Sequence, residues 1–263
     1  MSPRAFLVRG LLAGLLAGVA TFLVAYAVGE PQVGAAIALE AISSGDSGGD
    51  GHSHSHAAEG DEGGDEAAEV PRTNQSTWGL LTGTLAVGVA LGGILGLVAA
   101  AALGRLGRLT PSQSTALVTL IGFVAVALVP FLKYPATPPA VGSGDTIGLR
   151  TSVYFGYLLV SVLAAVLATY GAVRLRERVG TYAAVVGGTA AYLLVVVVAG
   201  HLFVTVNEIG DFPADTLWSF RLASLITLAT MWGLLGVALT GLVGRLYAAE
   251  RAVAERKALA ASL

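Results

Sequence analysis

Six long apolar runs, separated by polar or proline-rich segments, organise this chain. A hydrocarbon core about 30 Å thick requires about 20 apolar residues from each helix that crosses it. The runs that approach this length cover residues 5–28, 78–103, 114–132, 151–173, 181–206 and 217–246. This pattern predicts an all-α fold class: a polytopic transmembrane helix bundle of about six helices, built as a single transmembrane domain over residues 1–263.

Composition agrees with lipid as the main solvent of this chain. Charged residues make up 12% of it, whereas soluble domains have about 25%. The net charge of −2 gives no indication of a nucleic-acid partner, and the absence of cysteine excludes disulfides and thiolate metal sites. The first apolar run is longer than the roughly 7–15 residues of a signal-peptide core, so we expect it to be a retained helix.

Basic residues are distributed unequally between the two sides that six spans create. One side carries 11 of the 15 Lys and Arg residues: Arg4, Arg9, Arg105, Arg108, Arg174, Arg176, Arg178, Arg245, Arg251, Arg256 and Lys257. The positive-inside rule therefore predicts a multi-pass protein of the cell membrane with both termini cytoplasmic. Residues 247–263 are then a cytoplasmic tail that continues the last helix into solvent.

The long polar segment 29–77 becomes an external loop in this topology. Its middle, residues 43–69, is a low-complexity stretch of Gly, Ser, Asp, Glu and His that cannot bury enough apolar surface to fold alone, so it is predicted to be disordered. Residues 30–41 are less polar and could form a short helix along the membrane surface. Because Glu30 precedes Pro31, we expect the first helix to turn there.

Three of the four histidines lie in this loop, at His52, His54 and His56. An extended chain places alternate residues on one side, where the three imidazoles could chelate an ion. Short His-rich tracts are typical of metal binding, and neighbouring carboxylates would add oxygen ligands. The tract therefore predicts weak capture of a metal ion. The alternative is a solubilising acidic loop whose histidines are incidental.

The fourth histidine, His201, lies near the outer end of the fifth apolar run. Thr205 and Glu208 follow at i+4 and i+7, which would place all three on one helical face. Imidazole and carboxylate together suit a borderline cation such as Co, Ni or Zn. The alternative is a histidine hydrogen-bonded between helices, with Glu208 in water. Glu30 and Glu40, after the first run, either line a path for ions or are unpaired carboxylates at the membrane interface.

Two further segments carry unusual residues near the outer side. Prolines at four positions between 130 and 139 predict an irregular external connector, which is either a stiff wall beside a pore or a structural turn. At the start of the sixth run, Arg221 is expected to pair with Asp215, Glu208 or Asp211.

Glycines recur at every fourth position in the first two apolar runs: Gly10, Gly14, Gly18, Gly88, Gly92 and Gly96. Such ladders let helix backbones approach closely inside a bilayer. Packing within the chain is the favoured interpretation. A homo-oligomer or a partner-helix face is the alternative.

Several of these segments together resemble the CbtA family of predicted cobalt transporter subunits. The resemblance rests on Gly29-Glu30-Pro31, the His-rich acidic loop, and the segment 131–142 with Lys133, Tyr134, Pro135, Pro138 and Pro139. It rests also on Arg150-Thr151 and on Phe212-Pro213-Ala214-Asp215 followed by Trp218, Phe220 and Arg221. Thr137 departs mildly from the family pattern, which usually has Asn there. The family is often described with five helices, whereas the apolar runs here number six.

The resemblance implies a membrane subunit that takes up cobalt for cobalamin synthesis beside a small single-helix CbtB-like subunit. The leading hypothesis is therefore uptake of a divalent transition-metal ion, with external histidines capturing it and Glu30, Glu40, Glu208 and His201 forming a descending path. The metal is cargo rather than a permanent cofactor. The alternative is a non-transporting metal sensor or scaffold. The chain lacks a Walker motif, an H-E-x-x-H motif and a serine–histidine arrangement, so no enzyme activity is expected.

Overall fold

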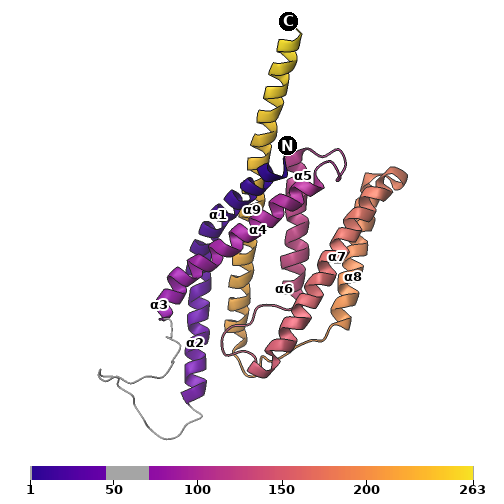
Figure 1. Ribbon diagram of the computed structural model, residues 1–263. Helices are drawn as coiled ribbons and strands as arrows, with labels where there is room; N and C mark the ends of the chain where they lie inside the picture. Colours follow the sequence, from indigo (N-terminus) through magenta and orange to yellow (C-terminus); the bar gives the residue numbers. More distant parts are fainter. Residues whose placement is uncertain (1, 46–70, 263) are drawn as a thin grey trace.

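The computed structural model describes residues 2–45 and 71–262, and all regular structure in these ranges is helical. Six helical segments are long and apolar enough to cross a membrane: Pro3–Ile42, Arg72–Ala102, Pro111–Lys133, Gly144–Val179, Thr181–Leu202 and Ala214–Ala261. The predicted fold class is therefore confirmed. The predicted tail is also helical, because α9 (Ala214–Ala261) continues as an exposed helix beyond the bundle (Figure 1).

The first helical segment does not turn at Glu30, so that prediction is wrong. The helix α1 (Pro3–Val24) passes through a π-helical turn, η1 (Ala25–Gly29), directly into α2 (Glu30–Gly45). In that turn the Glu30 amide donates to the Ala25 carbonyl, one residue further back than in an α-helix. This wider turn accommodates Pro31 without ending the helix. Residues 30–41 therefore extend α1 rather than forming a separate surface helix (Figure 1).

The tightest helix contact joins α1 to α4 (Leu80–Ala102) through the two glycine ladders. Gly10, Gly14 and Gly18 lie against the α4 backbone, and a Cβ on Gly18 would sit 2.8 Å from the Thr84 carbonyl oxygen. The ladders therefore pack within the chain, as favoured from the sequence. Each ladder covers the other within the chain, and oligomerisation stays a prediction.

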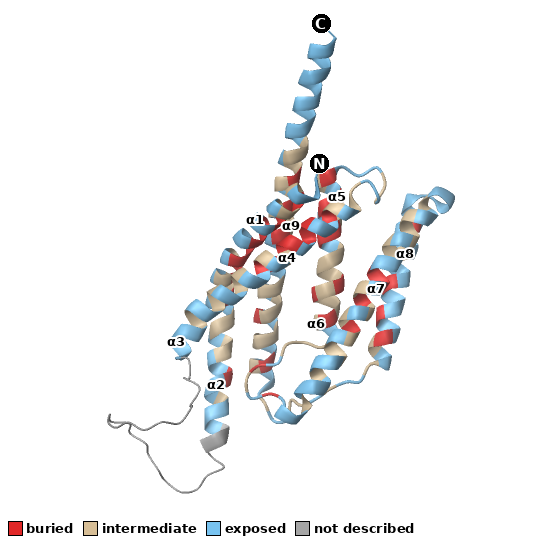
Figure 2. Cartoon of the chain, in the orientation of Figure 1, coloured by how far each residue is buried: buried red, intermediate tan, exposed pale blue. Residues whose placement is uncertain are grey.

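The remaining helices complete two connected groups. Buried residues gather where α1, α4, α5 (Pro111–Gly122) and α9 meet (Figure 2), with Leu235, Leu239 and Val243 of α9 fully buried. The second group is the hairpin of α7 (Ile147–Val179) and α8 (Thr181–Leu202). It joins the first group through η3 (Phe123–Leu128), whose Ala125 carbonyl accepts a 2.8 Å hydrogen bond from Ser161.

The two ends of the bundle differ in chemistry. Both termini lie toward one end, the upper one in Figure 1. The opposite end, here called the loop end, carries α3 (Arg72–Asn74), η2 (Gln75–Gly79), the end of α6 (Val129–Lys133), η4 (Gly144–Thr146) and the segment 203–213. The proline-rich stretch after α6 is irregular from Tyr134 to Ser143, as predicted.

Candidate functional site

Glu30 lies at the loop end, where α1 passes into α2. Its carboxylate accepts an ion-paired hydrogen bond from Arg72, at the start of the second membrane-spanning segment. The sequence did not identify this partner, although Arg72 is the basic residue lying furthest into the outer side of the predicted topology. Glu40 is exposed on α2, about 15 Å further along the helix at 1.5 Å per residue. The two carboxylates are therefore too far apart to bind one ion.

Glu30 also lines a cavity of about 510 Å³ between α1, α4 and α9, here called the Glu30 cavity. Glu30 supplies the only charged side chain among its described lining residues. Four hydroxyls and one thioether line it too, from Thr21, Thr84, Ser224, Thr227 and Met231. The Thr21 hydroxyl is buried and donates to the Met231 sulfur at 3.8 Å. The cavity therefore combines one carboxylate with neutral oxygen and sulfur donors.

His201 does not share a helical face with Thr205 and Glu208, so that prediction is wrong. The helix α8 ends at Leu202, and Phe203 is extended. A change from helix to extended chain destroys the 3.6-residue periodicity on which the shared face depended. His201 is exposed in the last turn of α8, and no hydrogen bond or ion pair of its side chain is found within the described chain.

Glu208 instead holds two irregular segments together. Its carboxylate accepts a 3.1 Å hydrogen bond from the Ser143 amide and lies 3.7 Å from the Arg150 Nε. Hydrogen bonds from the Thr146 hydroxyl and the Ser143 amide, together with the Arg150 charge, lower the pKa of Glu208 below its ordinary value. The carboxylate is therefore ionised and already engaged by donors, and a cation would have to displace them.

The Lys133-Tyr134-Pro135 segment contacts the same stretch after α8. Lys133 Nζ donates to the Thr205 hydroxyl at 3.0 Å, and the Tyr134 hydroxyl donates to the Val204 carbonyl at 2.7 Å. Pro138 is buried and Pro139 half-buried. These contacts fix the proline-rich connector against residues 203–208.

Between these two segments and α7 lies a cavity of about 450 Å³, here called the basic cavity. Its charged lining residues are Lys133, Arg150, Glu208 and Arg221. Arg221 makes no ion pair in the described part of the chain, so its predicted pairing with Asp215, Glu208 or Asp211 is wrong. The reason is that α9 begins at Ala214, which leaves Asp215 exposed in the first turn and places Arg221 about two turns in, facing the cavity.

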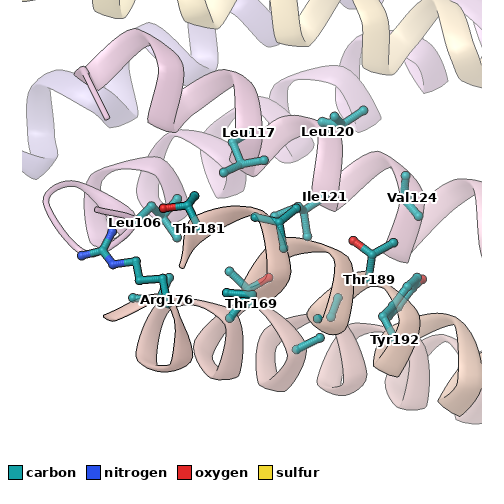
Figure 3. Close-up of a pocket in the computed structure, with 17 residues that line it drawn as sticks. Leu106, Leu117, Leu120, Ile121, Val124, Thr169, Arg176, Thr181, Thr189 and Tyr192 are labelled. Atoms are coloured by element: carbon teal, nitrogen blue, oxygen red, sulfur yellow. The ribbon is translucent and has the colours of Figure 1, made fainter. Parts of the chain in front are cut away.

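A third cavity, of about 410 Å³, separates α5 from the α7–α8 hairpin (Figure 3). Leucine, isoleucine, valine and alanine side chains make up most of its wall, and Arg176 is its charged member. Its described lining contains no carboxylate, imidazole or thioether. It therefore offers no ligand set for a transition-metal ion.

The predicted metal ligands are not assembled into one site. Within residues 2–45 and 71–262, no group of three or more His, Cys, Asp or Glu side chains could hold a metal ion. Glu30 and Glu208 line different cavities, and His201 lines neither. The histidines His52, His54 and His56 lie outside the described residues.

Comparison with known families gives a match over most of the chain. The family described as "Probable cobalt transporter subunit (CbtA)" matches residues 3–244. No curated protein and no solved structure matches the chain. The match includes the first five membrane-crossing helical segments, the sixth as far as residue 244, both cavities at the loop end and the proline-rich connector. It supports a multi-pass membrane protein with the role of a transport subunit.

Proposed function

Because the chain belongs to the CbtA family, we propose that it is the membrane subunit for uptake of a divalent transition-metal ion, with cobalt as the expected cargo. The observation that carries this proposal is the Glu30 cavity, which has a carboxylate at the loop end and neutral donors along α1, α4 and α9. A small CbtB-like single-helix subunit is the expected partner, and both termini are cytoplasmic.

Capture is the first step of the proposed uptake. The loop histidines His52, His54 and His56 and the acidic residues around them concentrate the ion near the membrane. Glu40, exposed on the α2 extension, adds a carboxylate between that loop and Glu30.

Transfer to Glu30 is the second step. The Glu30–Arg72 ion pair is partly exposed, with 19% and 42% of the two side chains accessible. Exposed ion pairs contribute only roughly 0–1 kcal/mol, so a divalent ion can compete with Arg72 for the carboxylate. The hydroxyls and the Met231 sulfur then offer several weak ligands in sequence. Weak binding at several sites lets an ion leave as well as enter.

The membrane potential can drive this movement. Each positive charge gains about 2.3 kcal/mol per 100 mV of inside-negative potential, so a divalent ion gains about 4.6 kcal/mol. No nucleotide-binding motif is needed for such a step.

The proposal is tested by radiolabelled cobalt uptake into a metal-starved host that produces this chain with and without the candidate small partner. Glu30→Gln should abolish most of the uptake, because the amide keeps the shape but loses the charge. His201→Ala is the matched control, since this imidazole lies at the same end without lining the Glu30 cavity.

Equal uptake by the Glu30→Gln variant and the unaltered chain would overturn the proposed path. Absence of uptake under every condition, with the protein correctly inserted, would favour the sensor or scaffold hypothesis instead.

A further inference from the structure

The basic residues at the loop end are not spread over its surface. Four Lys and Arg residues lie on this side of the predicted topology, and three of them line the basic cavity: Lys133, Arg150 and Arg221. Glu208 is the only acidic side chain among the described residues that line it. The cavity therefore carries two more positive than negative charges, which is the wrong sign for a site that holds a free metal cation.

The hydrogen bonds of these cations leave donors unused. Arg150 donates to the Ser143 carbonyl at 3.0 Å, and Lys133 donates to the Thr205 hydroxyl. Arg221 differs, because its side chain makes no hydrogen bond or ion pair within the described chain, whereas the Nε atoms of Arg150 and Arg221 are both buried without a hydrogen-bond partner. A half-buried guanidinium without a partner is unfavourable, and an oxyanion in the cavity that Arg221 lines would pair with its charge.

We propose that the basic cavity binds a small ligand through an anionic oxygen group, a carboxylate or a phosphate. A guanidinium presents its N–H groups in a planar fork that matches such groups. Apolar side chains of Ile147 and Phe155 and the Tyr154 ring complete the wall, and the volume of about 450 Å³ accommodates a small polycarboxylate or a lipid headgroup.

This site is separate from the proposed metal path. Helix α9 stands between the two cavities, with Phe220 lining the Glu30 cavity and Arg221 lining the basic cavity. Anion binding is measured without any metal, so its failure and the failure of cobalt uptake are distinguishable.

Citrate binding to the purified full chain in detergent, measured by calorimetry in metal-free, low-salt buffer, tests the proposal. Arg221→Gln should weaken binding about tenfold or more, because charge-assisted hydrogen bonds are lost. Arg174→Gln, a control at the opposite end where Arg174 is exposed, should leave it unchanged. Glu208→Gln should tighten citrate binding, because removing the only acidic side chain of the described lining frees Arg150 to bind the anion. A merely structural role of Glu208 would not produce tighter binding.

A second arm distinguishes the source of the anion. The chain in nanodiscs of phosphatidylglycerol or phosphatidylcholine is examined for bound lipid by native mass spectrometry. Selective retention of phosphatidylglycerol that Arg221→Gln abolishes would identify a lipid headgroup as the ligand. Should Arg221→Gln fail to fold, Lys133→Gln replaces it in both arms. The proposal is overturned if the unaltered chain binds neither citrate nor phosphatidylglycerol, or if the cavity variants bind as the unaltered chain does.

Discussion

Gly142 lines the basic cavity, and a single substitution there tests the backbone geometry of the cavity wall. Its φ of +105° is a conformation that side chains rarely adopt, and a Cβ there would collide with the Arg150 guanidinium. We expect Gly142→Ala to lower the melting temperature in detergent, corresponding to about 1–3 kcal/mol of strain.

Gly144→Ala is the matched control for this change, because no atom lies within 4 Å of its Cβ position and its φ is ordinary. Equal melting temperatures for the two variants would contradict the positive φ of Gly142.

At this scale, the sequence located charged residues better than it located their partners. Glu30 and Arg221 are conspicuous because charge near a membrane is costly. Their contacts depend on chain geometry that single residues do not encode. Glu30 pairs with Arg72 across 42 positions. Within the described residues, Arg221 makes no ion pair with the acidic residues expected to pair with it, because α9 begins at Ala214, three residues before the predicted apolar run.

At the scale of helices, the α1–α4 contact carries the sharpest prediction. A Cβ on Gly92 would collide with the Gly10 carbonyl oxygen and lie 2.9 Å from the Gly14 Cα. Because these are backbone atoms, the collision can be relieved only if α1 and α4 move apart. We expect Gly92→Ala to destabilise the bundle by about 1–3 kcal/mol, seen as a lower melting temperature and a smaller monodisperse fraction in detergent.

Gly83 on the same helix provides the comparison, since nothing lies within 4 Å of its Cβ position. Gly83→Ala should melt as the unaltered protein does. A Gly92→Ala variant as stable as Gly83→Ala would show that α1 and α4 do not cross through the glycine ladders.

The number of spanning helices was predictable, whereas several helix ends were not. Hydropathy identifies the stretch of chain that contacts lipid, but a helix can continue beyond that stretch into water. The continuation of α1 into α2 was missed in this way, whereas the continuation of α9 into the tail was predicted. The opposite error occurred at α8, where residues 203–206 of the predicted run lie outside the helix and are held by hydrogen bonds from Lys133 and Tyr134. Periodicity alone cannot identify such tertiary contacts.

For the whole molecule, the orientation in the membrane is the prediction to test. The chain has no cysteine, so single cysteines can be introduced without background. We expect Ser143→Cys, at the loop end, to react with an impermeant maleimide in intact cells. Ser262→Cys, in the exposed tail, should react only after permeabilisation.

The reverse labelling pattern would place the Arg-rich end outside and contradict the charge argument. It would also put both loop-end cavities on the cytoplasmic side, where capture by the loop histidines could not serve uptake.

Flux of cobalt into proteoliposomes is the most direct test of the proposed metal uptake. The purified chain, alone and with its candidate small partner, is reconstituted and an inside-negative potential is imposed. We expect cobalt accumulation that depends on the potential and is lost in the Glu30→Gln variant. No accumulation with or without the partner, in vesicles where single-cysteine labelling confirms correct insertion, would contradict it.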